Sequence, residues 1–307
     1  MKKIKLSYVL TTFNKYSFIK VVLPELVQNK KNDEEIIVID GGSNDGTNEY
    51  LGGQHNTGNI DYFLTEKDKG EAHGFNKGFL LASGDLIKVI TDDDAFNYSV
   101  IQKCKDFMLL HPEIDVLGGN TGTISIENKN SLFLAHDFED DFFKWREGKL
   151  KNFFFNGTCL IIRRSSLSLT GLFNTTTMHV DMEYTLRISS VAKIAWCTGI
   201  ISTRILNSQS NYMRYPERAK IDDEKLCQFY NYKHSHIRKR EELKNRSTYK
   251  KIHSFLSSVK ASFVNKGHSK DGLSYPDNKV YTFDEVNDYC IQWMTNHKLN
   301  KDIKFLT

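Results

Sequence analysis

Three adjacent carboxylates give the sequence its clearest chemical signal. Asp92, Asp93 and Asp94 follow Thr91 and the apolar run IKVI, so they stand at the end of a predicted strand. Carboxylates this close repel one another unless they share a cation, and Mg²⁺ or Mn²⁺ binds carboxylates together with phosphate oxygens. The motif therefore suits a metal that bridges to a diphosphate. From these residues alone, a solvated acidic turn or a helix N-cap is the alternative, because Asp is favoured in both.

A second polar cluster is the glycine-rich turn IDGGSNDGT, which starts at Ile39. Its glycines permit positive φ or close backbone approach, and Asp40 is placed to accept hydrogen bonds from NH or OH groups of a ligand. A plain tight turn is equally compatible. An EF-hand does not fit, because Gly42 and Asp45 stand where a calcium ligand and the turn glycine are required. The sequence also lacks a G-x-G-x-x-G fingerprint after the first strand and a G-x-x-x-x-G-K-[ST] loop.

These clusters follow short apolar runs that alternate with helical patterns. The apolar runs occupy residues 6–10, 35–39, 60–64 and 86–90, and apolar residues recur at helical spacing within 18–28 and 75–80. This alternation predicts a parallel sheet with helices on both sides. Ligands of such sheets bind beyond the carboxyl ends of the strands, where the polar segments 11–14, 40–47 and 92–94 fall. Farther along, we expect buried strands at 153–162 and 194–205 and a helix at 181–191.

Composition limits the classes of protein that the chain can belong to. With 307 residues, 39% hydrophobic and 26% charged, it should fold as one large domain with an appendage, or as two domains. A net charge of +4 is too small for a dedicated nucleic-acid binder. Five cysteines without a C-x-x-C pair indicate neither a zinc knuckle nor a disulfide framework, and favour a reducing compartment. No uncharged apolar run is long enough for a spanning helix.

The composition changes near residue 214, where long, charged and Lys- and Asn-rich segments begin. We therefore predict one domain at 1–210, which contains the strand-end polar clusters, and a mainly helical region at 211–307. The stretch 233–251, KHSHIRKREELKNRSTYKK, is markedly basic on a predicted helix. It could lie on anionic lipid, or form a solvated or homodimer-forming helix.

Taken together, the segments resemble a known family. The series LSYVLTTFNK, EEIIVIDGGSNDGT and EKDKGEAHGFNKGFLLASGDLIKVITDDD is similar in order and spacing to the N-terminal half of family 2 glycosyltransferases. The resemblance continues more weakly through FNGTCLIIRRSSLSLTGLFN and VDMEYTLRI, so that it covers about residues 4–205.

The resemblance implies an α/β GT-A fold: a Rossmann-like, mostly parallel sheet flanked by helices, here with a helical C-terminal extension. It also implies a nucleotide-sugar donor and a divalent cation, Mn²⁺ or Mg²⁺. The residues that it assigns to the donor are Thr11, Phe13, Asn14, Asp40, Ser43, Glu66, Asp68, Asn76, Lys77 and Asp92. Among them, Phe13 offers a ring face for the base, and Asn76 and Lys77 should open toward the same cleft. The resemblance makes Asp93 the principal metal ligand, and Asp94 either a second ligand or a residue that orients the acceptor or a metal-bound water.

Two departures from the family pattern concern the metal. Thr91 stands where relatives often carry Asp, so the register of the metal motif on residues 92–94 can shift by one. Asn207 stands at the position where many relatives carry a metal-binding His. His179 could be recruited in its place, although a lone His is more often a surface or core residue.

The resemblance assigns the catalytic base to Asp181, at the start of a predicted helix. Inversion requires a base on the face opposite the departing diphosphate, and a helix N-terminus favours the ionised carboxylate. A simple N-cap is the alternative, and Glu183 is the reserve candidate.

The expected function is therefore transfer of a hexosyl or N-acetylhexosaminyl group from a UDP-sugar to a hydroxyl of a glycan or lipid-linked acceptor. We expect it to serve bacterial surface polysaccharide synthesis, in the cytoplasm and at the inner face of the membrane. One alternative is a sugar-phosphate nucleotidyltransferase, which needs a basic, Gly-rich N-terminal loop where TTFNKYSF supplies only Lys15. The other is a non-catalytic nucleotide- or glycan-binding module.

Overall fold

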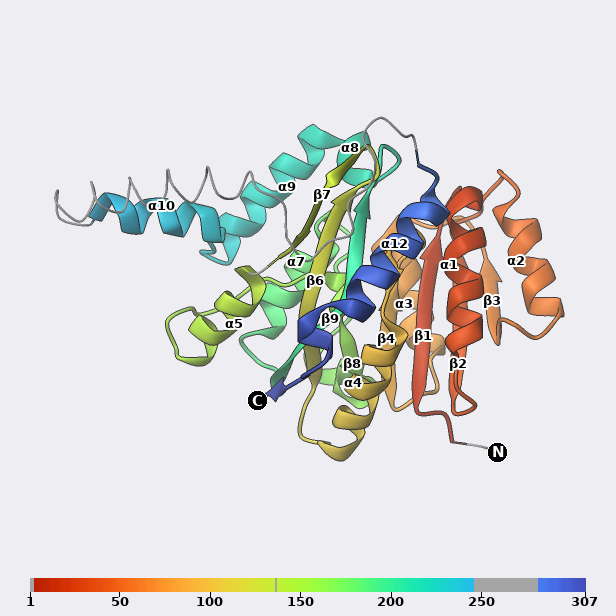
Figure 1. Cartoon of the computed structure of the whole chain (residues 1–307), viewed down its shortest axis with the longest axis horizontal. Helices are drawn as coiled ribbons and strands as arrows, with labels where there is room; N and C mark the ends of the chain where they lie inside the picture. The colour runs from red at the N-terminus through yellow and green to blue at the C-terminus, as the bar shows by residue number, and fades with distance from the viewer. Residues whose placement is uncertain (1–2, 136, 246–280) are drawn as a thin grey trace.

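The computed structural model describes residues 3–135, 137–245 and 281–307, which form a central sheet flanked by helices (Figure 1). In spatial order the strands run β10-β9-β6-β8-β4-β1-β2-β3, with β5 paired to β9 and β7 to β6. The strands are β1 (Leu6–Thr12), β2 (Glu34–Asp40), β3 (Tyr62–Thr65), β4 (Leu86–Ile90), β5 (Ala95–Phe96), β6 (Val116–Ser125), β7 (Asn128–Leu134), β8 (Ile161–Arg163), β9 (Ile194–Leu206) and β10 (Phe305–Leu306).

The described helices vary in length from single turns to fourteen residues. They are α1 (Tyr16–Asn29), α2 (Thr47–Asn56), α3 (Glu71–Leu81), α4 (Tyr98–Leu110), α5 (Asp137–Arg146), α6 (Leu167–Thr170), α7 (Val180–Ile188), α8 (Asn211–Arg214), α9 (Pro216–Phe229), α10 (Ser235–Asn245) and α12 (Phe283–Asn296). Short 3-10 helices span Gly157–Cys159, Arg164–Ser166 and Lys298–Asn300.

The N-terminal part of the sheet is parallel. β1 pairs in parallel with β2 and β4, and β2 with β3, so the four strands end at one edge. β8 then runs antiparallel to both β4 and β6, whereas β9 is parallel to β6. The predicted mixed α/β architecture with a mostly parallel N-terminal half is confirmed.

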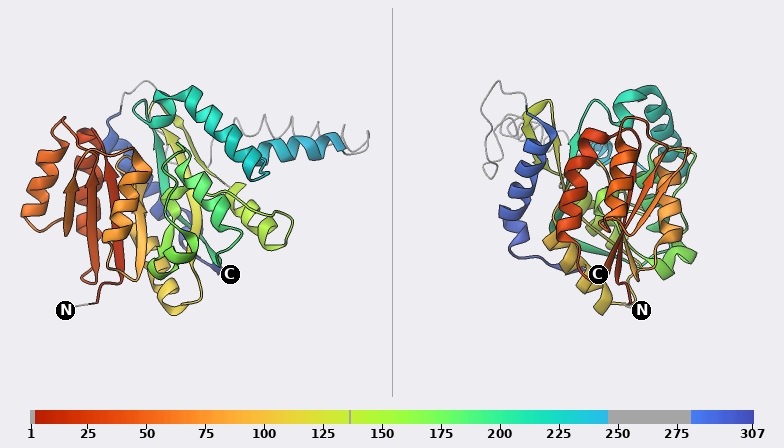
Figure 2. Two further views of the ribbon diagram at one scale, coloured as in Figure 1. Left: turned by 180° about the vertical axis from the view of Figure 1, so that it is seen from behind. Right: turned by 90° about the vertical axis from the view of Figure 1, so that its right-hand side faces the viewer.

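Side-chain alternation along β1 supplies both faces of the sheet. Leu6, Tyr8 and Leu10 face a core that α1, α4 and α12 complete, whereas Val9 faces the core under α3, α5 and α7. Figure 2 shows the second of these faces, with α3 and α7 in front of the strands in the view from behind. On that face Gly78 lets α3 approach β1 closely, because a Cβ there would lie 2.2 Å from Val9 Cγ1. The approach brings the start of α3 to the strand ends.

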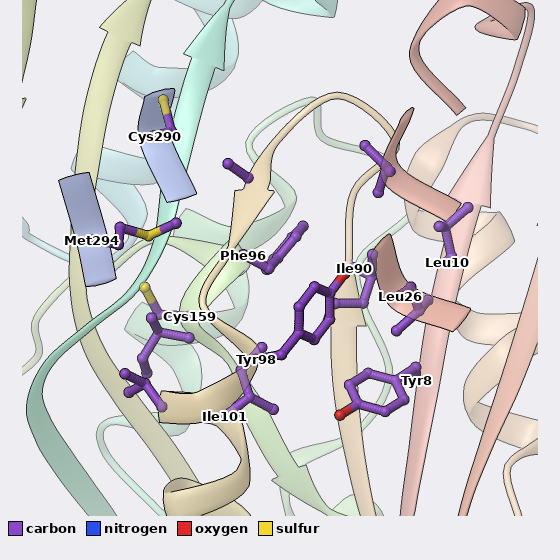
Figure 3. Close-up of a cluster of buried hydrophobic side chains, with 14 of the residues drawn as sticks. Tyr8, Leu10, Leu26, Ile90, Phe96, Tyr98, Ile101, Cys159, Cys290 and Met294 are labelled. Atoms are coloured by element: carbon purple, nitrogen blue, oxygen red, sulfur yellow. The ribbon is translucent and has the colours of Figure 1, made fainter. Parts of the chain in front are cut away.

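The last described segment returns to the sheet. The rings of Phe18 and Phe283 lie 4.7 Å apart, edge to face, where α12 packs on α1. Figure 3 shows Cys290 and Met294 of α12 in the same buried cluster as Phe96 and Tyr98. β10 then pairs antiparallel with β9. α12 and β10 pack on the main hydrophobic core, so residues 211–307 do not all lie apart from the sheet. The predicted boundary near residue 210 and the role of the region after it stay predictions.

One predicted strand is shorter than expected. Within 153–162 only β8 is extended, and the 3-10 turn Gly157–Cys159 precedes it. Asn156 caps this turn, because its Oδ1 accepts from the Thr158 backbone N at 2.9 Å and from Thr158 Oγ1 at 2.6 Å. Buried Phe153 and Phe155 make the segment look like a strand, but they pack against Trp196 without joining the sheet ladder.

α9 and α10 lie beside the sheet and extend away from it, at the left of Figure 1. α10 is tied to α5 by the ion pairs Arg238–Asp141 and Lys239–Asp137. Residues 246–251 of the basic stretch fall outside the described residues, as does the rest of 246–280. No helix of the described part of the chain is both long and apolar enough to cross a membrane.

Candidate active site

The three polar clusters meet at one edge of the sheet because their strands are neighbours in register. Thr12 at the end of β1 is paired with Asp40 at the end of β2, and Leu10 is paired with Ile90 at the end of β4. The loops that follow must therefore lie side by side at the carboxyl edge. The start of α3 and the start of α7 add further side chains to this edge.

The loops after β1 and β2 are joined by hydrogen bonds. Asn14, with φ of 51°, donates its backbone N to Ser43 Oγ at 2.8 Å, and its Oδ1 accepts from the Asn44 backbone N at 2.9 Å. The neighbouring ring of Phe13 is 51% exposed, whereas Thr11 is buried. An exposed, anchored aromatic ring beside a rigid loop is a suitable stacking surface for a nucleobase.

Asp40 holds the β2 loop in place. Its Oδ2 accepts from the Ser43 backbone N at 3.0 Å and from Thr65 Oγ1 at 2.6 Å, and its Oδ1 accepts from Ser43 Oγ. The carboxylate is fully buried. Asp40 and Ser43 thus shape the loop in this structure, and Asp40 does not present a free oxygen to a ligand as the sequence suggested.

The loop between β3 and α3 lies against the β2 loop. Glu66 forms an ion pair with Lys77, with Oε1 and Nζ 2.7 Å apart, and Lys77 lowers the pKa of the exposed Glu66 carboxyl. Asp68 caps its own loop by accepting from the Gly70 backbone N at 2.8 Å. It also contacts Gly41, where a Cβ would lie 3.1 Å from Asp68 Oδ2. Glu66, Asp68 and Lys77 therefore form one charged group beside the β2 loop.

Asn76 does not join this group, contrary to the expectation that it opens toward the donor. It is buried, its Nδ2 donates to the Phe173 backbone O at 2.8 Å, and its Oδ1 accepts from the Phe173 backbone N at 2.8 Å. Both polar atoms of the amide are satisfied by this backbone pair. Asn76 therefore anchors the segment before α7 to α3.

The acidic triplet divides into three environments. Asp93 Oδ2 lies 2.6 Å from Lys15 Nζ and accepts from Asn207 Nδ2 at 3.0 Å. No described group donates to its other oxygen. Asp92 is buried, and burial together with the charge of Asp93 raises its pKa to about 7.

Asp94 points into the protein. Its Oδ2 accepts from Thr91 Oγ1 at 2.6 Å, and its Oδ1 accepts from the Ile205 backbone N at 2.8 Å. Burial and the nearby Asp93 charge raise its pKa to about 7. Asp94 therefore ties the tip of β4 to β9 and does not fit the metal-ligand role that the sequence suggested for it.

Asp181 is held by the backbone at the start of α7. Its Oδ2 accepts from the Gly157 N at 3.1 Å and its Oδ1 from the Met182 N at 2.8 Å. Gly157 must be small here, because a Cβ would lie 2.8 Å from Asp181 Cβ. Two backbone amides therefore fix the position of the Asp181 carboxylate.

Glu71, the first residue of α3, shows that Asp181 and the triplet share one electrostatic site. Glu71 is exposed as a residue, but its carboxyl is partly desolvated among the groups at the strand ends. Burial of the carboxyl is the largest cause that raises the pKa of Glu71 to about 8, and the negative charges of Asp181, Asp92 and Asp93 add to it. Negative charge is therefore in excess here despite Lys15.

The two other candidates near Asp181 face elsewhere. Glu183 is buried and paired with Arg187, whose Nε lies 2.9 Å from Glu183 Oε1, and Tyr230 donates to the same oxygen at 2.9 Å. His179 is buried, with Nε2 2.7 Å from the Ala219 O of α9. Neither side chain belongs to the acidic group at the strand ends.

A divalent cation fits the donor set around Asp93. A carboxylate oxygen without a protein donor, next to carboxyls whose pKa values are raised by their neighbours, is what a hard cation stabilises. Asn207 does not replace the histidine of relatives as a ligand. Its Nδ2 donates to Asp93 while its Oδ1 accepts from the Gln209 N at 3.0 Å, so it positions Asp93.

Comparison with known proteins decides the family. Residues 7–170 match the family model described as glycosyl transferase family 2, which is more than half of the chain. The chain belongs to this family. A match of this extent includes nearly all of β1 to β8, and so the loops after β1, β2 and β3 and the acidic triplet.

Curated relatives of this family 2 chain are distant. Poly-β-1,6-N-acetyl-D-glucosamine synthase of Staphylococcus epidermidis is 25% identical over 229 residues, 72% of this chain and 49% of the synthase. An uncharacterized glycosyltransferase of Mycoplasma genitalium is 33% identical over 103 residues, 32% of this chain and 35% of that protein. The chain thus spans half or less of the length of these relatives.

Solved structures establish the GT-A fold for this family 2 chain. S. aureus TarS 1–349 in complex with UDP-GlcNAc has a TM-score of 0.54 at 16% identity, covering 69% of this chain and 61% of that one. Mannosyltransferase PcManGT from Pyrobaculum calidifontis, in complex with GDP-Man and Mn²⁺, has a TM-score of 0.54 at 12% identity, covering 97% and 87%.

Two residues of the site were missed by the sequence analysis. Lys15 entered the sequence analysis only as the single basic residue of TTFNKYSF, too few for a triphosphate-binding loop. Glu71 is the last residue of E-K-D-K-G-E, at a position where the family pattern specifies no residue type. The available signal was position: Lys15 directly follows the polar cluster after β1, and Glu71 opens a helix after Gly70 at the same edge.

Proposed function

We propose that this family 2 chain transfers a sugar from a UDP-sugar to a hydroxyl of a glycan or lipid-linked acceptor, with inversion. The observation that carries the proposal is one of geometry: Asp181 binds the Gly157 N in the turn before β8, and Asp93 follows β4, so that both lie at the same end of this antiparallel strand pair. The exposed Phe13 ring and the linked β1 and β2 loops lie at the same edge. N-acetylglucosamine is the first sugar to test, because the Staphylococcus epidermidis relative is named for it and TarS was solved with UDP-GlcNAc.

Asp181 is proposed to act as the base. Its carboxylate accepts the proton of the acceptor hydroxyl while that oxygen bonds to the anomeric carbon, and the bond from this carbon to the diphosphate oxygen breaks. The leaving UDP keeps the bonding electron pair. The backbone donors Gly157 N and Met182 N hold the Asp181 carboxylate in position before the reaction.

Positive charge must balance the leaving diphosphate. Lys15 is the described cation closest to Asp93, and Asn207 holds the Asp93 carboxylate from another side. When bound at Asp93, a divalent cation, Mn²⁺ or Mg²⁺, would supply Lewis-acid stabilisation of the diphosphate.

The proposal is tested with a panel of UDP-GlcNAc, UDP-glucose, GDP-mannose and dTDP-glucose, each with Mn²⁺, Mg²⁺ or a chelator. We expect UDP-GlcNAc with Mn²⁺ to raise the melting temperature most, since a ligand at 100 times its Kd adds about 2.7 kcal/mol. Release of UDP should then require Asp181. Stabilisation by GDP-mannose alone would overturn the UDP assignment, and binding without UDP release from any acceptor mixture would support a non-catalytic module.

We propose that the acceptor is elongated in the cytoplasm, at or near the membrane, as part of surface polysaccharide synthesis. The described part of the basic stretch offers few free charges for lipid, because Lys233 pairs with Glu241 while Arg238 and Lys239 pair with α5. A membrane contact of 233–251 and a homodimer stay predictions. Flotation with neutral and anionic vesicles tests the first, and sedimentation equilibrium tests the second.

A further inference from the structure

A second group of ligating side chains lies at the end of α9, away from the strand-end loops. Asp223, Cys227 and His234 bring their ligand atoms within 4.8 Å of one another. Cys227 Sγ is 3.8 Å from Asp223 Oδ2, and His234 Nε2 is 2.9 Å from Asp223 Oδ1. All three side chains are partly exposed. The proposed glycosyl transfer uses none of them.

The sequence folds this way for local reasons. Asp223 and Cys227 are four residues apart on α9, so they share one helix face. Asn231 adopts a left-handed conformation, with φ of 48°, and the Tyr232 N donates to the Cys227 O at 2.9 Å. This reversal resembles a Schellman turn and carries the chain back over the last turn of α9. His234 thereby reaches the face that Asp223 and Cys227 occupy.

The frame of the group is rigid. Leu226 and Tyr232 pack with Met182 and Leu186 of α7 in a small buried cluster. Asp222, next to Asp223, is buried and accepts from the Met178 N at 3.0 Å. Cys227 itself packs partly against this cluster. The contacts with α7 therefore hold α9, and with it Asp223 and Cys227, in a defined position.

Thiolate, imidazole and carboxylate together are ligands of zinc, whereas Mg²⁺ and Ca²⁺ prefer oxygen alone. Ligands of a tetrahedral zinc lie about 3.3–3.8 Å apart, given metal bonds of about 2.0–2.3 Å. The distances of 3.8 and 2.9 Å from Asp223 are close to this range, and the third pair lies within 4.8 Å. Burial, and then the charge of Asp223, raise the pKa of the Cys227 thiol to about 11 without a metal. A bound dication reverses that effect, because two anionic ligands and a neutral imidazole balance its charge.

We propose that Asp223, Cys227 and His234 form a Zn²⁺ site that fastens the end of α9 to the start of α10. The fourth coordination position faces solvent. The site stabilises the segment that leads into α10, whose Arg238 and Lys239 bind α5. It is independent of the cation expected at Asp93.

The test uses the full chain, stripped of metal with a chelator and titrated with Zn²⁺ or Co²⁺. We expect Co²⁺ to give a thiolate-to-metal charge-transfer band at one equivalent, and Zn²⁺ to slow the reaction of Cys227 with a thiol-specific disulfide reagent at least tenfold. The reagent is selective, because Cys227 is partly exposed while the other four cysteines are buried. A carboxylate site such as Asp93 gives neither signal.

Three variants and a control complete the test. Cys227→Ser should abolish the band, and Asp223→Asn and His234→Gln should each weaken Zn²⁺ binding at least tenfold. The control is His111→Gln, a partly exposed histidine that pairs with Glu113 just after the end of α4, which should bind like wild type. Metal-free Cys227→Ser should melt within about one degree of metal-free wild type, which excludes unfolding as the cause. A band that survives in Cys227→Ser, or a thiol rate that Zn²⁺ leaves unchanged, overturns the proposal.

Discussion

Lys15 Nζ lies 2.6 Å from Asp93 Oδ2, in a largely buried ion pair that joins the loop after β1 to the tip of β4. The side chains of Lys15 and Asp93 are only 10% and 17% exposed. Coulomb interactions are strong at such a site, since solvent screens them poorly. The positive charge of Lys15 therefore lies next to Asp93, where it would repel a divalent cation bound to the same carboxylate.

Lys15→Met should strengthen the binding of Mn²⁺ alone. Loss of a unit positive charge a few ångströms from the cation is worth about 1.4 kcal/mol or more in a partly buried site, so we expect Kd to fall roughly tenfold. Isothermal titration of Mn²⁺ measures this. Lys20→Met, on the exposed side of the helix α1 that follows Lys15, is the control and should bind as wild type does. Weaker Mn²⁺ binding in Lys15→Met would show that the lysine supports the cation and does not compete with it.

Asp93→Ala should abolish the Mn²⁺ dependence of UDP binding while the chain still folds. Asp93 lies at a strand end, and its Oδ2 accepts hydrogen bonds only from the side chains of Lys15 and Asn207, not from the backbone. Affinity for UDP with Mn²⁺ and with a chelator should become equal. Asp106→Ala, on the exposed face of α4, serves as the control. If UDP affinity in Mn²⁺ is unchanged in Asp93→Ala, the metal site is elsewhere.

Asp181→Asn should reduce turnover about 10² to 10⁴-fold and leave donor affinity nearly unchanged, because an amide cannot accept the proton of the acceptor. Circular dichroism should show a folded protein. The contrast is Glu183→Gln, which breaks the buried pair with Arg187 and should lower stability. Near wild-type turnover in Asp181→Asn would remove this residue as the base.

The metal-free protein should lose stability as pH rises from about 5 to about 8. The pKa of Asp92 is about 7 in the folded state, above its ordinary value of about 4, so the folded state retains a proton that the unfolded state has lost. Unfolding free energy then falls with pH across this window. We expect a fall on the order of 2 kcal/mol in urea titrations with a chelator.

Asp92→Asn should reduce this pH dependence, since an amide does not titrate, while Asp94 and Glu71, whose pKa values are also raised, keep part of it. Mn²⁺ should restore stability at pH 8 in the wild type. A wild-type stability that rises between pH 5 and pH 8 without metal would contradict the electrostatic picture of the strand-end carboxyls.

Asn76→Ala should lower the free energy of unfolding by about 2–3 kcal/mol, because the Phe173 backbone N and O lose their buried partners. Chemical denaturation measures the loss. The affinity for UDP at a temperature where the variant is folded should stay within a factor of about three. A large, selective loss of donor affinity would return Asn76 to the donor site.

Much of the sheet and the place of the site could be predicted from sequence. The apolar runs that became β1, β2 and β4 are short and bounded by polar clusters, and parallel strands place such clusters at one edge by geometry alone. The role of Asp93 as the principal metal ligand stays a prediction; the structure leaves one of its carboxylate oxygens without a described donor. The family resemblance, confirmed by the match over residues 7–170, supplied the rest.

Side-chain direction could not be predicted, because it depends on contacts between segments far apart in the chain. Asp94 turns inward since the Ile205 N of β9 donates to it across 111 residues. Asn76 turns away from the donor side since Phe173, 97 residues later, takes its amide. The proposed zinc ligands could not be found by looking for paired cysteines, because the group contains only one Cys. His234 joins it through the turn at Asn231, which the sequence did not reveal.

The contact between Phe18 and Phe283 has a consequence for biosynthesis. α1 leaves the ribosome early, but the aromatic partner that covers it is made 265 residues later, with β10 still to follow. Until then one side of the nascent sheet exposes apolar side chains, so the segment containing β1 and β2 is open to chaperones and to aggregation. Translation rate and chaperone supply should therefore govern the yield of active protein more than the stability of the finished fold does.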